Sequence, residues 1–312
     1  MSRPPSRRGD LDGILLVDKP KGWTSHDIVA KLRGVTGQRR SGHTGTLDPM
    51  ATGLLVLCLG RATRLVEYMT VHDKRYTGEI TLGAATTTDD AEGEVIATGT
   101  PPPLDGQALA EIAAQFTGSI QQRPPAFSAI KSGGRRAYAI ARAGGDPALK
   151  ERQVAVHALT LRLTAPDRLS LELHCGPGTY VRSLARDIGE LLGCGAHLSS
   201  LRRITVGRFA ITEAWTVDEL TALADPASAL LPADDGLLEI PAALLDDGKA
   251  ARLAAGGAIA TAAAGASREV LRVYSRSGQF VGTAHLHADG ELRPGKVLAP
   301  QAVMSQAEPA AD

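Results

Sequence analysis

The apolar run LLVLCL, Leu54–Leu59, is the feature that most constrains the fold of this chain. Six consecutive apolar residues bounded by Gly53 and Gly60 predict a strand that is buried on both faces. A compact polar loop, SGHTGTLDPMAT, comes immediately before this strand. Its Asp48–Pro49 pair has two interpretations. Asp48 caps a turn, because Asp is a good N-cap residue and Pro a good first helical residue, or it carries out chemistry beside the buried strand.

Alternating and helical apolar patterns on either side of this strand predict a mixed fold. The segment GILLVDKPKG predicts a strand ending in a turn, and period-two alternation predicts strands at 75–83, 153–163 and 168–175, the last two as a pair. Helical periodicity with capping residues predicts helices at 24–34 and 105–118. A strand is expected to turn into a helix near Ser183, and a capping box formed by Thr216 and Glu219 predicts the start of another helix. Because strands and helices do not alternate strictly, we expect an α+β domain with a mixed, largely antiparallel sheet.

The length of 312 residues and a change of composition near residue 230 predict two domains. The segment LLPADDG is acidic and contains proline, so it is interpreted as a linker. Beyond it, a helix over 242–256 and several short strands with turn signals predict a small β-rich domain. The expected organisation is a disordered tail 1–10, a catalytic domain 11–230 containing a basic insertion 123–152, a small domain 238–300 and a loose tail 301–312.

Several kinds of protein are disfavoured by the sequence. The three cysteines have no CxxC spacing, which argues against a zinc ribbon or a disulfide framework and favours a reducing compartment. The longest aliphatic run is too short to cross a membrane, so we expect a cytoplasmic protein. The phosphate-cradle, metalloprotease and serine-hydrolase motifs are missing from the sequence. Any chemistry is therefore expected to need no cofactor and no metal.

The charges are unevenly distributed although the net charge is zero. Residues 121–160 carry seven Lys and Arg against two acids, whereas residues 211–312 carry seven against fourteen. Local density of basic side chains, rather than the total, decides phosphate binding. The basic insertion therefore fits contact with a nucleic-acid backbone through Lys131, Arg135 and Arg136, and its alternative interpretation is a disordered surface loop.

The segment GHTGTLDPMATGLLVLCLGRATR resembles the signature of the TruB family, bacterial synthases that make pseudouridine in the T loop of tRNA. Further segments resemble the family's other motifs in the same order: LLVDKPKGWTS, DKRYTGEITLG, RPPAFSAIKSGGRRAY and CGPGTYVRSLARDIGELLGCGAHLSSLRR. Together they cover most of residues 11–210. The C-terminal part is similar, more weakly, to the PUA-type RNA-binding domain found in many members. Two positions depart from the usual pattern, Thr46 and Phe127.

This resemblance implies a role for each matching residue. Asp48 matches the catalytic aspartate, Tyr76 the aromatic residue that stacks on the target uracil, and Arg182 the arginine that pairs with the carboxylate. His43 matches a histidine beside the flipped base. The remaining matches are to residues that line the pocket, namely Lys19, Pro20, Tyr180 and Leu201. Arg186 is interpreted as a solvated helix charge or a phosphate contact.

The implied function is isomerisation of uridine to pseudouridine at position 55 of tRNA, by a monomer that contacts the T-arm stem-loop. The base must first be flipped out of the loop. Asp48 then acts as nucleophile or base while the glycosidic bond breaks and C1′ is rejoined to C5. Three alternatives remain: a synthase that acts on another RNA or as a guide-dependent subunit, an RNA-binding or RNA-folding protein, and a nucleoside glycosylase that releases free uracil.

Overall fold

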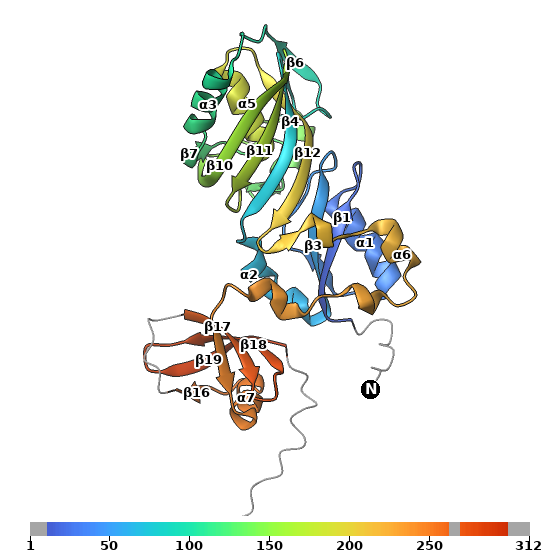
Figure 1. The fold of residues 1–312 in the computed structure, drawn as a ribbon, viewed down its shortest axis with the longest axis vertical. Helices are drawn as coiled ribbons and strands as arrows, with labels where there is room; N and C mark the ends of the chain where they lie inside the picture. The colour runs from blue at the N-terminus through green and yellow to red at the C-terminus, as the bar shows by residue number, and fades with distance from the viewer. Residues whose placement is uncertain (1–10, 262–268, 299–312) are drawn as a thin grey trace, which may run out of the picture.

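The computed structural model describes residues 11–261 and 269–298 (Figure 1). The predicted tails, 1–10 and 301–312, lie outside these residues. One large mixed sheet carries the catalytic part of the chain, in the order β14-β1-β3-β12-β4-β11-β10-β7, with β2 paired to β3 and β13 to β12. Its long strands are β1 (Gly13–Lys19), β3 (Thr52–Leu59), β4 (Lys74–Leu82), β10 (Arg152–Ala165), β11 (Arg168–Cys175) and β12 (Ala196–Val206). Its short strands are β2 (Ser41–His43), β7 (Gly118–Gln122), β13 (Phe209–Ala210) and β14 (Trp215–Thr216).

The pairing within this sheet confirms the mixed, largely antiparallel architecture. Parallel pairing is limited to β1 with β14 and β3 with β12, and every other pair in the sheet is antiparallel. The parallel contact between β3 and β12 joins two strands that are far apart in sequence. It brings the start of β3 beside Arg202 and Arg203, in the middle of the sheet.

Strand β3 is buried on both faces, as its unbroken apolar sequence predicts. Leu55, Leu57 and Leu59 belong to a core beneath helices, while Leu54, Val56 and Cys58 belong to a second core on the other face of the sheet. The first core also receives apolar residues of α1 (Ser25–Thr36), α3 (Gly106–Gln115), α5 (Val181–Leu191) and α6 (Val217–Ala222). The loop before β3 is therefore attached to one of the most deeply buried strands.

The helices begin where side chains or turns satisfy their first amide groups. Thr24 caps α1 in a capping box with Asp27, and Asp105 caps α3. Helix α5 begins at Val181, earlier than predicted, and a turn rather than a strand precedes it. The remaining helices are α2 (Val66–Thr70), α4 (Ala137–Arg142), α7 (Asp247–Ala254) and the 3₁₀ turns Gly60–Leu65, Ile211–Glu213, Pro226–Ala229 and Ala233–Leu237. No helix among the described residues is long and apolar enough to span a membrane.

The C-terminal part forms a separate five-stranded sheet in the order β15-β17-β18-β19-β16 with its own small apolar core. Its strands are β15 (Ala242–Leu245), β16 (Ile259–Ala260), β17 (Glu269–Ser275), β18 (Phe280–Leu286) and β19 (Glu291–Val297). The helix predicted over 242–256 is wrong in its first half. AALL pairs in parallel with β17, and the helix begins only after Asp246, whose carboxylate accepts a hydrogen bond from the amide of Lys249.

The segment predicted to be a linker is instead packed against the large sheet. Leu231 exchanges two backbone hydrogen bonds with Ile14, of 2.9 and 2.8 Å. Leu237 is buried in the second core, which also contains Leu298 from the C-terminal sheet. The acidic side chains of this segment suggested a solvated linker. One of them, Asp235, instead forms an ion pair with Arg208, with 3.0 Å between the charged groups.

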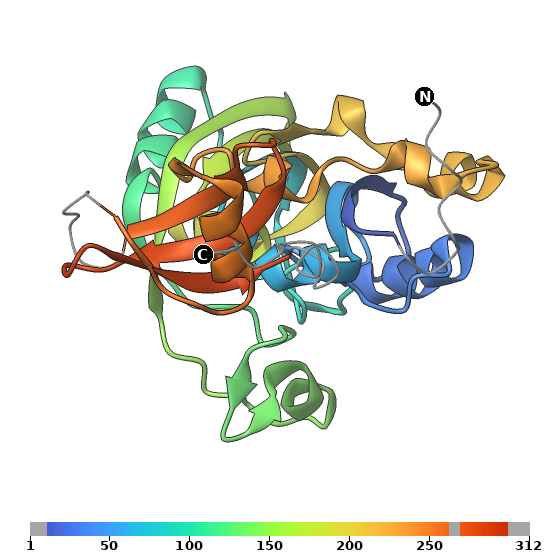
Figure 2. The ribbon, with the colours of Figure 1, turned by 90° about the horizontal axis from the view of Figure 1, so that it is seen from below.

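Two hairpins project from the large sheet. The first is formed by β5 (Ala84–Thr86) and β6 (Val95–Thr98), and the second by β8 (Lys131–Ser132) and β9 (Arg135–Arg136). The second hairpin and the helix α4 that follows it make up the predicted basic insertion. Figure 2 shows them in green, standing away from the rest of the molecule. The insertion therefore has secondary structure.

We predict that Gly53 at the start of β3 cannot be replaced without a large loss of stability. Its φ is +99°, and a Cβ there would lie 2.3 Å from the backbone oxygen of Arg203. Gly53→Ala should lower the free energy of unfolding by about 2–3 kcal/mol because the backbone must shift. Gly42→Ala is the control, since no atom lies within 4 Å of a Cβ at that position. Urea denaturation of both variants is the measurement, and equal effects would contradict the close approach of β3 and β12.

Candidate active site

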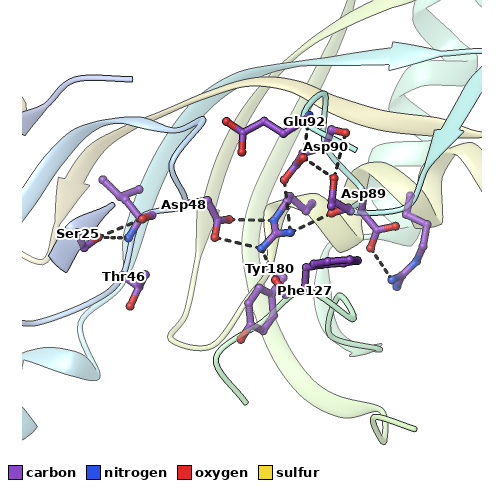
Figure 3. A network of polar contacts seen from close by, with 12 residues as sticks. Ser25, Thr46, Asp48, Asp89, Asp90, Glu92, Phe127 and Tyr180 are labelled. Atoms are coloured by element: carbon purple, nitrogen blue, oxygen red, sulfur yellow. Dashed lines mark hydrogen bonds and ion pairs between the residues drawn. The ribbon is translucent and has the colours of Figure 1, made fainter. Parts of the chain in front are cut away.

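Asp48 lies in the loop before β3 and is held by Arg182, at the beginning of α5 (Figure 3). The guanidinium donates from Nε to Oδ2 at 2.9 Å and from Nη2 to Oδ1 at 3.1 Å, so the contact is bidentate. The turn interpretation expected this carboxylate to cap its own loop. Its side chain instead accepts hydrogen bonds from Arg182. It is 34% exposed whereas Arg182 is 5% exposed, so the acid faces open space while its partner is buried.

The remaining donors of Arg182 fix the guanidinium in one orientation. Nη1 donates to the carbonyl oxygen of Thr88 at 2.9 Å, and Nη2 also donates to that of Phe127 at 3.0 Å. The carboxylate of Asp90 lies 3.4 Å from Nη1. Three separate segments of the chain thus meet at the Arg182 side chain. This arrangement fixes the orientation of the Asp48 carboxylate as well.

Arg186, one turn further along α5, is not the solvated charge that the sequence predicted. Its side chain is 19% exposed and forms ion pairs of 3.0 Å with Asp89 and 2.7 Å with Asp187. It also donates to the carbonyl oxygen of Arg123, 2.9 Å away. Burial raises the pKa of Asp89, and Arg186 opposes that shift. Arg186 therefore ties the loop beside Thr88 to the start of the insertion.

A cavity of about 470 Å³ opens in front of Asp48. Of the predicted residues, Asp48, Tyr76, Tyr180, Arg182, Leu201 and Arg136 line it. Tyr76 lies on β4 and is 8% exposed, and burial raises the pKa of its hydroxyl group. Thr46 and Phe127, the two atypical positions, also line the cavity, and the Phe127 ring meets Tyr138 edge-on at 6.0 Å.

Lys19, Pro20 and His43 do not line this cavity. Lys19 is fully buried, and its ammonium group donates to the carbonyl oxygens of Pro20, Trp23 and Pro49, at 2.9, 2.7 and 3.3 Å. Burial lowers the pKa of Lys19 to about 8. Burial also lowers the pKa of His43, which lies on β2. Lys19 thus supports the Asp48–Pro49 turn from behind rather than facing the cavity.

Arg203 on β12 is a site residue that the sequence did not single out. It is 2% exposed and donates to the carbonyl oxygens of Leu54 at 2.7 Å, Gly45 at 3.0 Å and Thr46 at 3.3 Å. Its strand partners are Gly53 and Tyr76, so it lies directly between the catalytic loop and the aromatic residue. The alternating pattern of SSLRRITV was the one sequence signal that could have identified Arg203 as a buried residue. It is easily overlooked, because charged residues are usually exposed.

The basic side chains of the insertion divide between the cavity and solvent. Lys131 and Arg135 are exposed on the β8–β9 hairpin, whereas Arg136 is exposed and also reaches the cavity wall. Asp90 and Glu92 line the same wall, although the sequence suggested no second acid. Asp90 is committed to other contacts, because it accepts from the Thr88 hydroxyl group at 2.6 Å and from the Glu92 amide at 3.0 Å.

Taken together, the site offers a carboxylate held by arginine at Asp48, two further acids at Asp90 and Glu92, an aromatic wall and basic side chains at its rim. Comparison with known proteins gives a consistent result. Residues 33–181 match the model of the family described as TruB family pseudouridylate synthase (N terminal domain). Residues 182–237 match the tRNA pseudouridylate synthase B C-terminal domain, and residues 241–298 match Pseudouridine synthase II TruB, C-terminal.

Similar proteins extend over almost the whole chain. The chain is 42% identical over 302 residues to a tRNA pseudouridine synthase B of Xylella fastidiosa, covering 96% of this chain and 99% of that protein. It is 50% identical over 230 residues to one of Leifsonia xyli, covering 72% and 75%. Among solved structures, a Cbf5-Nop10-Gar1 complex shares the fold, with a TM-score of 0.72 at 24% identity, covering 94% of this chain and 86% of that chain.

We predict that Arg203 and its neighbour Arg202 differ sharply in their contribution to stability. Arg203→Lys leaves buried carbonyl oxygens without donors, each costing about 1–3 kcal/mol, so a loss of roughly 2–4 kcal/mol is expected. Arg202 pairs with Asp18 at 2.7 Å but is 41% exposed. Arg202→Lys should therefore cost less than about 1 kcal/mol. Chemical denaturation measures both, and an equally small loss for Arg203→Lys would show that the loop does not depend on this contact.

Proposed function

The chain belongs to the TruB family of pseudouridylate synthases, and on that premise we propose that it isomerises uridine to pseudouridine in tRNA, at position 55 of the T loop. The observation that carries the proposal is the bidentate Asp48–Arg182 contact at a cavity lined by Tyr76. The proposed catalytic residue is Asp48. The proposed substrate-binding residues are Tyr76, Tyr180, Arg182 and Leu201, which share this cavity.

The size and walls of the cavity suit a base taken out of a folded RNA loop. A volume of about 470 Å³ lies within the range of small-molecule pockets. Extracting the base costs a few kcal/mol in lost stacking and pairing. Tyr76 offers a flat face on which a uracil can stack, worth about 1–3 kcal/mol. Stacking on Tyr76 thus replaces part of what the base loses when it leaves the loop.

The chemistry requires one ionised oxygen beside C1′ of the ribose. An Asp48 oxygen either attacks C1′ as a nucleophile or removes the C2′ proton, and in both routes the bond between C1′ and N1 breaks. The freed uracil turns within the cavity and C5 bonds to C1′, which releases the Asp48 oxygen from C1′ in the nucleophilic route or is accompanied by return of the proton to C2′ in the other. The C5 proton is then lost and N1 gains a proton. The product is an isomer, and no water is consumed. Arg182 keeps the carboxylate oriented throughout by its two hydrogen bonds.

The basic insertion is proposed to hold the RNA backbone over the cavity. Phe127, Arg136 and Tyr138 from this segment line the cavity, and Lys131 and Arg135 are exposed on the same hairpin. A hairpin that contributes to the cavity wall can clamp a stem-loop whose base enters the cavity. We also propose that the C-terminal sheet is a PUA-like RNA-binding domain and that the enzyme acts as a monomer in the cytoplasm, with no metal or cofactor in the reaction.

A single assay separates this proposal from its rivals. The purified chain is incubated with an unmodified tRNA transcript and no other RNA or protein, and pseudouridine is mapped by carbodiimide modification and primer extension. The isomerase forms pseudouridine at position 55 and releases no uracil. A glycosylase releases free uracil, a guide-dependent subunit is inactive alone, and an RNA-folding protein leaves the uridine unchanged. Any of these three results would overturn the proposal.

We predict that Asp48→Asn abolishes isomerisation in a protein that still folds and still binds tRNA, with some loss of stability because buried Arg182 loses a charged partner. Asparagine keeps the shape of the side chain, but an amide is neither nucleophile nor base at neutral pH. Asp105→Asn is the matched control, because Asn caps a helix about as well as Asp and Asp105 caps α3 outside the cavity. Thermal melting, filter binding and single-turnover assays on both variants are the measurements. Retained activity in Asp48→Asn would remove this carboxylate from the mechanism.

We predict that the insertion contributes to the salt dependence of RNA binding. Replacing Lys131, Arg135 and Arg136 by alanine should reduce the slope of log affinity against log salt by about one unit for each lost phosphate contact. Arg162→Ala is the control, because Arg162 is an exposed basic residue on β10, outside the insertion, whose guanidinium lies 3.8 Å from the carboxylate of Glu172. Affinity is measured for a tRNA transcript over a series of salt concentrations. A slope unchanged from that of the unmodified protein would exclude the clamp.

A further inference from the structure

Three potential metal ligands meet on the surface of the large sheet, away from the active site. Asp73 lies in the turn before β4, His157 on β10 and His174 on β11. Oδ2 of Asp73 is 3.2 Å from Nε2 of His157 and 3.7 Å from Nε2 of His174. The ligand atoms of all three lie within 4.8 Å of one another. Within the described residues this is the only such group of three or more His, Cys, Asp or Glu side chains.

The two histidines are neighbours across the β10–β11 pair, at an irregularity in the strand pairing. Val156 pairs with Cys175, but the next pair is Ala158 with His174, so His157 is an extra residue in β10. A bulge of this kind re-aims a side chain out of the regular alternation. The imidazole ring of His157 comes to lie with its centroid 4.7 Å from that of His174. The carbonyl oxygen of Asp73 accepts from the amide of Gly207 at 2.8 Å, which fixes the third member.

The arrangement fits a tetrahedral metal ion with one open position. Zinc binds imidazole nitrogen and carboxylate oxygen at about 2.0–2.2 Å, which places neighbouring ligand atoms roughly 3.3–3.5 Å apart. The distances from the Asp73 carboxylate to His157 and His174, 3.2 and 3.7 Å, lie on either side of this range. A cavity of about 340 Å³ lined by Asp73 and His174 adjoins the group. It gives an ion access from solvent and leaves room for a water molecule as fourth ligand.

Arg75 on β4 is the strand partner of His174. Its positive charge repels a metal cation and so lowers the affinity of this group for the ion. The side chains of the three ligands are 28–46% exposed, which leaves them accessible to an ion from solution. Magnesium and calcium prefer oxygen ligands and do not suit two imidazoles.

We propose that Asp73, His157 and His174 form a binding site for one divalent transition-metal ion of the zinc class. The ion joins the turn before β4 to strands β10 and β11. Arg75, the partner of His174, and Tyr76 are consecutive on β4, so their side chains point to opposite faces of the sheet. The site is therefore structural and separate from the cavity that contains Asp48. It braces the beginning of the strand that carries Tyr76.

Zinc binding to the tag-free, chelator-treated full-length protein tests this proposal. Equilibrium dialysis should give one Zn²⁺ per chain, and His157→Gln, His174→Gln and Asp73→Asn should each weaken binding by about tenfold or more. His26→Gln is the matched control, because His26 is exposed on α1, outside the group. Its affinity should equal that of the unmodified protein. Thermal melting without metal shows that each variant is folded.

Two further readouts distinguish a built site from nonspecific binding. Co²⁺ should give the intense absorption of four-coordinate geometry, and excess Mg²⁺ should not displace Zn²⁺. Zn²⁺ should raise the melting temperature of the unmodified protein and of His26→Gln, and should leave that of His174→Gln unchanged. The proposal is overturned if no stoichiometric binding is found, or if the three ligand variants bind Zn²⁺ as tightly as His26→Gln.

Discussion

The contact between Arg182 and Asp48 is the interaction on which the geometry of the active site depends. A guanidinium that is only 5% exposed must find partners for its donors, since an unpaired buried charge costs several kcal/mol. Those partners come from the loop before β3, from Thr88 and Asp90, and from Phe127 in the insertion. Satisfying one arginine therefore requires that these segments meet where β3, β4 and β12 run side by side.

Two further buried cations hold the same loop from other directions. Lys19 donates to the carbonyl oxygen of Pro49, after the aspartate, and Arg203 donates to those of Gly45 and Thr46, before it. The loop is anchored by these backbone carbonyl oxygens and also by Leu47, Met50 and Ala51, which are buried in the first core. A carboxylate fixed in this way needs little reorganisation when substrate arrives, which is the condition for precise chemistry on a loop. The scaffold is rigid because β3 is buried on both faces.

Local patterns predicted the elements well and failed where packing competes with propensity. The unbroken apolar run of β3, the alternation of β10 and β11 and the capped helix α1 all describe real elements. AALL after residue 241 has a helical composition, yet it forms a strand because β17 offers it a partner. The acidic segment 231–237 looks like a linker, yet Leu231 and Leu237 anchor it to the large sheet. Neither competing contact is visible in the local sequence.

The sequence by itself determined the class of fold, because periodicity is a local property of the chain, and its ordered motifs supplied the proposed roles of Asp48, Arg182 and Tyr76. Only the tertiary structure decided which other charged residues are buried. Lys19 and Arg203 lie beneath the catalytic loop and Arg186 is fully paired, since each finds acceptors on distant segments. The same reason applies to Asp73, His157 and His174. Their meeting depends on the register of β10 against β11 and on the position of the turn before β4, and residue spacing along the chain encodes neither in a readable form.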